Sequence, residues 1–247
     1  MNGLQSEKEM TVVIACRNEA DNLPLLLDEI EAALEGRDHE VIIVDDGSTD
    51  GTAEKLGPRV ADSGGRLRML RHDRSAGQSA AVRSGVFAAN GRVVVTLDGD
   101  GQNDPHDLPA MIGRIAPAGD NSRLALIGGV RQKRKDTGSK RWASKAANRI
   151  RDWVLHDDCP DTGCGIKVFW REVFLKLPFF TSIHRYLPAL FQTYGYRCEY
   201  VPVNSRERVA GVSKYNNFNR ALIGLYDLVG VSWLRRRTRH PQIREDG

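Results

Sequence analysis

Three short apolar runs restrict what this chain can fold into more than any other feature. Thr11–Cys16 (TVVIAC), Glu40–Val44 (EVIIV) and Arg92–Leu97 (RVVVTL) are near-continuous and rich in β-branched residues, which is typical of strands buried on both faces. Helical patterns lie between them, with a leucine stripe over 23–34 and a second pattern over roughly 78–89. This alternation predicts an α/β fold with a single Rossmann-like, mostly parallel, twisted sheet and helices on both faces.

A cluster of polar residues follows each of the three runs. These clusters are Arg17–Asn22, Asp45–Thr52 and Asp98–Asp104. The carboxyl ends of parallel strands meet at one edge of a sheet, and ligands of such folds bind beyond that edge. The topology alone therefore predicts a functional site where the three clusters converge.

The remainder of the chain is less regular. Further strands are expected at 66–70, 124–130, 166–169 and 198–203, and helices over about 139–155, 185–194 and 217–234. The 247 residues contain no repeat, low-complexity tract or linker, and this length suits one sizeable domain. We therefore expect a polar tail over 1–10, one domain over 11–215 and a C-terminal amphipathic helix with a basic flank over 216–240.

The densest acidic motif comes directly after the third apolar run. Asp98 and Asp100 are separated by Gly99 and followed by Gly101 and Gln102. Residues two apart in a strand share a face, so both carboxylates are expected to point toward one spot. Mg²⁺ and Mn²⁺ suit such hard oxygen ligands and bind one or two carboxylates together with substrate phosphates. A plain turn rich in Asp and Gly is the alternative, but the position at the functional edge favours a metal site.

The loop Asp45–Thr52 is the second acidic motif. A carboxylate directly after a buried strand, such as that of Asp46, can accept hydrogen bonds from a nucleobase or a ribose. The alternative is a simple strand-to-helix loop in which Ser48 or Asp50 caps the next helix. The chain contains neither G-x-G-x-x-G nor G-x-x-x-x-G-K-[ST], which argues against a dinucleotide fold or a P-loop.

Positive charge is concentrated in two blocks, although the net charge of the chain is only +4. Seven basic residues lie between Arg131 and Lys145 with the single acid Asp136, and the second block is Arg235–Arg239. Such blocks contact nucleic acid, phosphate-bearing small molecules or anionic lipids, or are merely solvated surface. The basic residues alone do not distinguish these partners.

Six motifs occur together in the order and spacing of one enzyme family. They are 15–19 (ACRNE), 45–52 (DDGSTDGT), 76–78 (AGQ), 98–104 (DGDGQND), 161–165 (DTGCG) and 208–214 (RVAGVSK). The chain resembles the family-2 inverting glycosyltransferases, which have the GT-A fold. The last two motifs are similar to segments of the polyprenyl-phosphate branch, which includes the dolichol-phosphate mannose synthases. The resemblance covers about Thr11 to Lys214.

The resemblance implies a role for the residues of each motif. Asp98, Asp100 and Gln102 match the ligands of a Mg²⁺ or Mn²⁺ ion that binds the donor diphosphate. The other implied contacts are Glu19 and Asp46 at the nucleoside, Asp100, Arg208 and Lys214 at the reacting centre, and Arg131, Lys140, Arg141 and Ser144 at the acceptor phosphate.

The chain departs from the family pattern at two places. The usual opening P-x-Y-N-E is ACRNE over 15–19, so the nucleoside contacts of the family's Pro and Tyr have no counterpart. Lys140 stands where an Arg is expected and Arg141 is adjacent, so the acceptor assignment is shared between these two residues.

Together the motifs imply transfer of a hexose from a nucleotide sugar to a polyprenyl or dolichyl phosphate. By resemblance, mannose from GDP-mannose is the default, and a UDP-hexose is the other donor class. A phosphate acceptor is already ionised near neutral pH and needs positioning by cations rather than a general base, so His72 and His184 are expected to be non-catalytic. The alternatives are a family-2 enzyme with a soluble or polysaccharide acceptor and, more remotely, a nucleotide or nucleic-acid binding module. The carboxylate pair argues against nucleic acid as a partner.

A lipid-borne acceptor requires contact with a membrane. The first ten residues lack an apolar h-region, and no run approaches the roughly 18 apolar residues of a spanning helix. Asn217–Leu234 is instead amphipathic, and Arg235–Arg239 after it matches a polybasic flank, attracted to anionic lipid by about 1 kcal/mol per charge. Core packing is the alternative for this helix. Four cysteines without a CxxC pair fit a reducing compartment, so we expect a cytoplasmic protein, peripheral on the inner face of the membrane.

Overall fold

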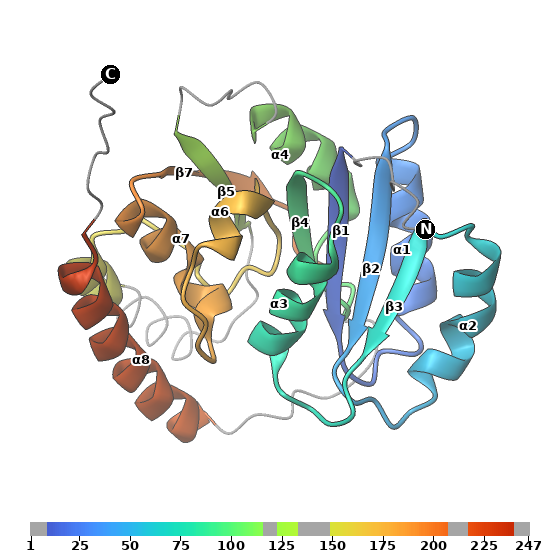
Figure 1. The fold of residues 1–247 in the computed structure, drawn as a ribbon, viewed down its shortest axis with the longest axis horizontal. Helices are drawn as coiled ribbons and strands as arrows, with labels where there is room; N and C mark the ends of the chain where they lie inside the picture. The colour runs from blue at the N-terminus through green and yellow to red at the C-terminus, as the bar shows by residue number, and fades with distance from the viewer. Residues whose placement is uncertain (1–8, 116–122, 133–148, 207–216, 240–247) are drawn as a thin grey trace, which may run out of the picture.

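The computed structural model describes residues 9–115, 123–132, 149–206 and 217–239 (Figure 1). Within these ranges the strands form one seven-stranded sheet in the order β3-β2-β1-β4-β6-β5-β7. The strands are β1 (Met10–Cys16), β2 (His39–Asp45), β3 (Leu67–Arg71), β4 (Val93–Asp98), β5 (Leu124–Arg131), β6 (Lys167–Trp170) and β7 (Arg197–Val203). Every strand expected from the sequence is present, with its ends displaced by no more than one residue.

The sheet is mostly parallel, as the alternating pattern predicts. β1 pairs in parallel with β2 and β4, β2 with β3, and β5 with β7. β6 runs antiparallel to both of its neighbours, β4 and β5. The reversal of β6 was not predicted, because the residues of a short apolar strand do not encode its direction.

The carboxyl ends of the three apolar strands lie within one residue of the same level in the sheet. In the parallel register Cys16 of β1 lies opposite Asp45 of β2, and Ala15 lies opposite Asp98 of β4. The loops that follow the three strands therefore start at the same edge of the sheet, which confirms the convergence expected from the topology.

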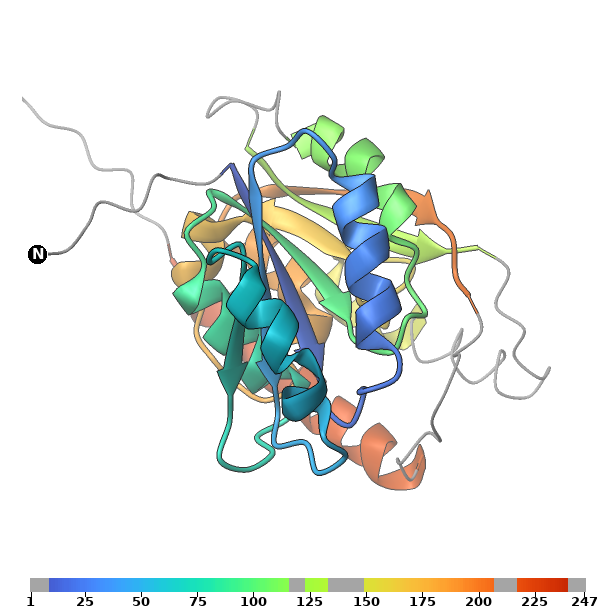
Figure 2. The same ribbon diagram turned by 90° about the vertical axis from the view of Figure 1, so that its right-hand side faces the viewer.

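Helices cover both faces of the sheet and bury two separate apolar cores. Alternate residues of a strand point to opposite faces, so Val12 and Ile14 join one core and Val13 joins the other. The first core includes residues of α1, α2 and α4, and Figure 2 shows α1 lying across that face. The second includes residues of α3, α6, α7 and α8. The helix bounds are α1 (Leu23–Ala33), α2 (Thr52–Asp62), α3 (Gln78–Ala88), η1 (Pro105–Asp107), α4 (Leu108–Ile115), α6 (Arg171–Leu175), α7 (Ile183–Thr193) and α8 (Asn217–Arg237).

The structure adds to the helices expected from the sequence. α4 and α6 were not predicted, because both are short and leave little room for a 3.6-residue period. The helix expected over 139–155 is described only from residue 149, and 149–155 are helical. α8 continues to Arg237, so Arg235–Arg237 form its last turn, where positive charge is favourable beside the helix C-terminus.

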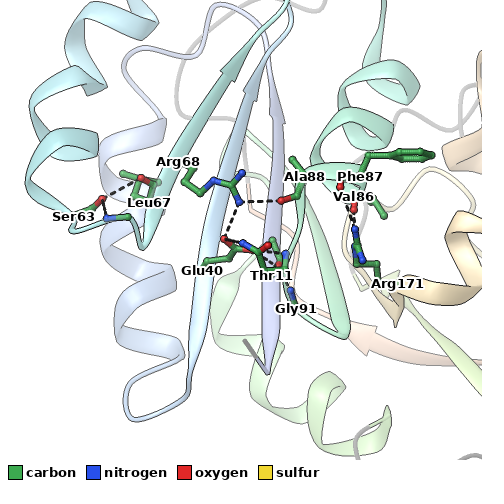
Figure 3. Close-up of polar contacts among 12 residues, drawn as sticks. Thr11, Glu40, Ser63, Leu67, Arg68, Val86, Phe87, Ala88, Gly91 and Arg171 are labelled. Carbon is green, nitrogen blue, oxygen red and sulfur yellow. Dashed lines mark hydrogen bonds and ion pairs between the residues drawn. The ribbon is translucent and has the colours of Figure 1, made fainter. Parts of the chain in front are cut away.

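A buried polar network joins the strands at the edge opposite the site (Figure 3). The Glu40 side chain is only 2% exposed, and its carboxylate accepts hydrogen bonds from Thr11 Oγ1 (2.8 Å), the backbone N–H of Asn90 (2.7 Å) and Arg68 Nη1 (3.1 Å). Arg68 Nη1 also donates to the carbonyl oxygen of Ala88 (2.9 Å). Glu40 thereby ties β1, β2 and β3 to the end of α3.

Removing this carboxylate is expected to destabilise the fold. Glu40→Ala leaves the donors of Thr11, Asn90 and Arg68 without their acceptor, and breaking a buried network of this kind costs about 3 kcal/mol. Urea unfolding followed by circular dichroism measures the loss. The control is Lys55→Ala, which removes an exposed ion pair with Asp21 and should change stability by less than about 1 kcal/mol. Equal unfolding midpoints for the two variants would contradict the network's importance.

Candidate active site

The loops after β1 and β2 are joined by reciprocal hydrogen bonds. The backbone N–H of Asn18 donates to Ser48 Oγ (2.8 Å), and the N–H of Thr49 donates to Asn18 Oδ1 (2.8 Å). The N–H of Ala20 donates to Asp50 Oδ2 (3.1 Å). Asn18 adopts a left-handed conformation with φ +58°, which Asn tolerates better than most residues. The two polar clusters therefore form one structural unit.

The interpretation of this loop as a helix cap holds for Asp50 and is wrong for Ser48. Gly51, in a left-handed conformation, occupies the N-cap position of α2, and the Asp50 carboxylate accepts from the backbone N–H of Thr52 (3.0 Å), the first residue of the helix. Ser48 instead accepts from the backbone of the first loop, as Asp50 does from Ala20. These polar side chains fix the functional edge of the sheet.

Asp46 organises a third loop. Its carboxylate accepts hydrogen bonds from Ser75 Oγ (2.7 Å) and from the backbone N–H groups of Ala76 and Gly77 (both 2.8 Å), and it pairs with His72 Nδ1 (2.7 Å). Burial opposes ionisation of Asp46, but these hydrogen bonds outweigh it and hold the pKa of the carboxyl below its usual value. Asp46 thus fixes the position of the segment that leads into α3. Its contact with a nucleoside remains a prediction.

Two other residues with expected roles are placed by this arrangement. Glu19 lies at the same edge, where its carboxylate accepts from Asn22 Nδ2 (2.5 Å). His72 is held between Asp46 and Ser84 Oγ, the latter 3.0 Å from its Nε2. Both ring nitrogens of His72 have partners within the protein, which gives it a structural role; that it is non-catalytic remains a prediction.

The acidic motif lies where β4 ends. Asp98 is the last residue of the strand, and its Oδ1 accepts a hydrogen bond from Gln78 Nε2 (2.5 Å) at the start of α3. Asp100 lies in the turn that follows, is 8% exposed, and accepts at Oδ1 from the backbone N–H of Gln102 (3.1 Å). Because the strand ends at Asp98, strand alternation does not set the direction of Asp100; the turn does. The carboxylate therefore shapes the turn as well as lying at the site.

Gly99 allows this turn to approach β1 closely. A Cβ atom at Gly99 would lie 2.7 Å from Cys16 Cβ, closer than two carbon atoms approach without overlap. The glycine therefore keeps the acidic turn against the end of the central strand, beside the loop after β1.

The donor set fits a hard divalent cation. The predicted ligands are two carboxylates, Asp98 and Asp100, and the amide oxygen of Gln102. No group of three or more His, Cys, Asp or Glu side chains that could hold a metal occurs among the described residues. Mg²⁺ and Mn²⁺ use few protein carboxylates and complete their coordination with phosphate and water, so these residues would hold the ion together with a diphosphate.

The 161–165 segment packs directly against Asp98. A Cβ atom at Gly165 would lie 2.2 Å from Asp98 Oδ2, so only glycine fits here with Asp98 in its present position. Thr96 Oγ1 on β4 donates to the carbonyl oxygen of Gly165 (2.8 Å) and fixes the approach. The segment that indicated the polyprenyl-phosphate branch therefore contacts the predicted diphosphate anchor.

Arg131 lies at the other end of that segment. Its guanidinium donates to both carboxylate oxygens of Asp161, from Nε to Oδ2 (2.7 Å) and from Nη2 to Oδ1 (2.8 Å). Burial disfavours the charged guanidinium, but Asp161 more than offsets this and raises the pKa of Arg131, which keeps it cationic. A Cβ atom at Gly163 would lie 3.0 Å from Arg131 Nη2. Arg131 is thus a fixed positive charge next to the 161–165 segment.

Five predicted site residues lie outside the described residues. They are Lys140, Arg141, Ser144, Arg208 and Lys214. Their roles remain predictions.

Sequence reasoning gave no site role to two residues that the fold brings close to the site. Gln78 was recognised as part of a motif but given no role, and it contacts Asp98. His184, at the start of α7, has its Nδ1 2.6 Å from Ser79 Oγ. These contacts join segments far apart in the chain, and the sequence holds no local signal for them.

Comparison with known protein families identifies the class of protein to which this fold and site belong. Residues 11–177 match Glycosyl transferase family 2. This match spans more than half of the chain, so the chain belongs to this family.

Relatives with named activities confirm the resemblance to the polyprenyl-phosphate branch. An undecaprenyl-phosphate 4-deoxy-4-formamido-L-arabinose transferase of an Enterobacter species is 31% identical over 231 residues, which cover 93% of this chain and 69% of that protein. A dodecaprenyl-phosphate galacturonate synthase of Rhizobium johnstonii is 32% identical over 242 residues, which cover 94% and 69% of the two chains.

Solved structures confirm the expected GT-A fold. Glucosyl-3-phosphoglycerate synthase of Mycobacterium tuberculosis, in complex with Mn²⁺, UDP-glucose and phosphoglyceric acid, matches with a TM-score of 0.66. The match covers 92% of this chain and 79% of that chain at 17% identity. At this identity the likeness concerns the fold alone.

The contact between Gly165 and Asp98 yields a prediction. In Gly165→Ala the new methyl group has to push Asp98 away and break its hydrogen bond with Gln78, so the affinity for Mn²⁺ with a nucleoside diphosphate is expected to fall at least about tenfold, or about 1.4 kcal/mol. The shift of the melting temperature by Mn²⁺ with UDP or GDP measures this. Gly113→Ala is the control, because its Cβ atom would enter open space. A ligand-induced shift in Gly165→Ala equal to that of the control would contradict the prediction.

Proposed function

We propose that this protein transfers a sugar from a nucleotide sugar to the phosphate of a polyprenyl phosphate. One observation carries the proposal: the acidic motif and the 161–165 segment are in direct contact through Asp98 and Gly165. The first is the predicted anchor of the donor diphosphate, and the second leads to Arg131, the predicted contact of the acceptor phosphate. Donor and acceptor phosphates are thereby assigned to neighbouring positions, as a direct displacement requires.

The chemistry of the reaction suits these residues. Negative charge develops on the departing nucleoside diphosphate, and a divalent ion held by Asp98, Asp100 and Gln102 supplies Lewis-acid stabilisation there. An ionised phosphate attacks without a general base, so the acceptor side has to supply only positive charge and orientation. Arg131 provides a cation whose orientation is fixed by two hydrogen bonds to Asp161. One inverting displacement on an α-linked nucleotide sugar breaks its bond to the nucleoside diphosphate and gives a β-linked sugar phosphate.

The identity of the transferred sugar is a second, more specific part of the proposal. Mannose from GDP-mannose is the default that the sequence predicts. The two relatives are named for a formamido-arabinose and a galacturonate, which supports a polyprenyl-phosphate acceptor without favouring mannose. GDP-mannose and UDP-hexoses are therefore tested side by side.

Asp100→Ala is expected to abolish transfer without unfolding the protein. The variant loses a predicted metal ligand and the acceptor for Gln102 N–H, so the rate of transfer should fall at least about a thousandfold. Labelled GDP-mannose and labelled UDP-hexoses are each incubated with polyprenyl phosphate and Mn²⁺, and label in the lipid extract is counted. Asp62→Ala is the control, because Asp62 is an exposed residue of α2.

Two outcomes would contradict the proposal. Near-normal transfer by Asp100→Ala would remove the acidic motif from the reaction. Label that appears only in a water-soluble glycan would replace the lipid acceptor with a soluble one, which is the alternative within the same family.

We further propose that α8 holds the domain 11–215 at a membrane surface. Leu228 and Val231 of α8 are buried in the second core, and Tyr186 of α7 donates to the carbonyl oxygen of Gly224 (3.0 Å). One face of α8 is therefore packed against the protein, and α8 runs along one side of the molecule (Figure 1). Among the described residues, no helix is both long and apolar enough to span a bilayer.

The other face of α8 is apolar and exposed. Tyr226, Val229 and Trp233 are 82%, 64% and 63% exposed, and Arg236 and Arg237 follow them on the surface. Aromatic and aliphatic side chains beside arginines suit the headgroup region of an anionic bilayer. This supports peripheral attachment to the cytoplasmic face of a membrane, with 216–240 as the interfacial segment.

Trp233→Gln is expected to weaken membrane attachment. Loss of one large apolar side chain from the interface costs about 1.5–3 kcal/mol, so partitioning should fall tenfold or more. Co-sedimentation with phosphatidylcholine vesicles, with and without phosphatidylglycerol, measures this. Leu25→Gln is the control, because Leu25 is 55% exposed on α1, on the opposite face of the sheet. Equal sedimentation of the two variants would contradict the role of α8.

A further inference from the structure

One ion-pair cluster joins three segments that are far apart in the sequence. Arg206 Nη1 donates to both carboxylate oxygens of Glu29 on α1, at 2.6 and 2.8 Å. Its Nη2 donates to Asp104 Oδ1 at 2.6 Å. The Arg206 side chain is 33% exposed, whereas Glu29 and Asp104 are 21% and 16% exposed. A planar guanidinium can bind two carboxylates in this forked way, and a lysine ammonium cannot reproduce the geometry.

Asp104 is a strongly held carboxylate. Its Oδ1 accepts from the backbone N–H of His106 (3.1 Å) and from Arg206 Nη2 (2.6 Å). Asp104 is the last residue of the acidic motif Asp98–Asp104. Its pairing with Arg206 therefore fixes the far end of the motif to α1.

The backbone around Arg206 fixes the same motif at further points. The N–H of Arg206 donates to the carbonyl oxygen of Gln102 (2.9 Å), and Ser205 forms an antiparallel bridge with Asn103. Asn204 donates from its backbone N–H to Asp107 Oδ2 (2.7 Å). The segment 204–206 thus runs alongside the acidic motif as a brace.

A short path of hydrogen bonds leads from this brace to the predicted metal ligands. The carbonyl oxygen of Gln102 accepts from Arg206, and the N–H of Gln102 donates to Asp100 Oδ1. Gln102 is therefore held from both sides, by the brace and by Asp100. Since β4 and Gly165 fix Asp98 at the other end of the motif, the brace restricts the conformation of the part between.

We propose that Arg206 is a positioning residue that holds the acidic motif in the conformation that binds a divalent cation with a nucleoside diphosphate. Arg206 acts through Asp104 and the Gln102 peptide, and it is not itself a ligand. This role rests on the proposed function, because it presupposes that the acidic motif binds the cation. A purely structural role for Arg206 would lower stability and leave cation affinity unchanged.

Arg206→Met tests this role against a second arginine that pairs with α1 and is about equally exposed. Arg59→Met is the control: Arg59 is 35% exposed and pairs with Asp28, the neighbour of Glu29 on α1, at 2.6 Å. Free Mn²⁺ is measured by electron paramagnetic resonance during titration of each full-length variant, with saturating UDP and separately with saturating GDP. Melting temperatures are recorded without metal. Arg206→Met is expected to bind Mn²⁺ at least tenfold more weakly than the wild type, while Arg59→Met binds like the wild type. Arg206→Met is also expected to melt at a lower temperature than Arg59→Met, because Glu29 and Asp104 are 21% and 16% exposed whereas Asp28 is 66% exposed.

Two further variants keep the result interpretable. Glu29→Gln removes the negative charge and one of the two acceptor oxygens that face Arg206, and it is expected to weaken Mn²⁺ binding in the same direction by a smaller factor. Arg206→Lys retains the charge without the fork and should fall between the wild type and Arg206→Met.

Wild-type affinity for Mn²⁺ in a folded Arg206→Met variant would overturn the positioning role and leave the proposed function intact. A wild-type protein that binds no Mn²⁺ with either nucleotide would overturn the metal site, and the positioning role with it. If Arg206→Met fails to fold, Glu29→Gln decides: affinity equal to that of Arg59→Met would overturn the proposal.

Discussion

The parallel register of β1, β2 and β4 is the constraint on which the site depends. Cys16, Asp45 and Asp98 end neighbouring strands within one residue of the same level, so three polar loops start within reach of one another. The register in turn depends on burial, because a slip by one residue would move every buried side chain of a strand to the opposite face. Two cores of apolar residues, one on each face, oppose any such slip. The same residues that stabilise the sheet therefore position the site.

Carboxylates gathered at one edge of the sheet repel one another, and hydrogen-bond donors from distant segments offset this repulsion. Asp46 receives four hydrogen bonds from the loop before α3 and Asp98 receives one from Gln78. Asp104 is paired with Arg206. These contacts lower the repulsion between acids and at the same time connect the loops. The cation that we propose at Asp98 and Asp100 would extend the same principle to a ligand.

The sequence predicted what depends on local pattern. Apolar runs such as Thr11–Cys16 gave the strands to within one residue, and motif spacing gave the acidic site and the family. Contacts between distant segments could not be predicted: the reversal of β6, the fit of Gly165 against Asp98, and the forked pairing of Arg206. Each depends on which surfaces meet in three dimensions, and a glycine or an arginine looks the same in sequence whether or not it makes such a contact. Ser48 shows the opposite error, since a residue suited to capping was recruited by a neighbouring loop.

The central claim is that the acidic motif at the end of β4 anchors a nucleoside diphosphate through a divalent ion. Crystals of the full chain grown with Mn²⁺ and UDP, or with Mn²⁺ and GDP, allow the ion to be located by anomalous scattering at the manganese edge. We predict an anomalous peak bonded to carboxylate oxygens of Asp98 or Asp100 and to oxygens of the diphosphate. A bound nucleotide whose diphosphate and Mn²⁺ lie away from both aspartates would contradict the claim.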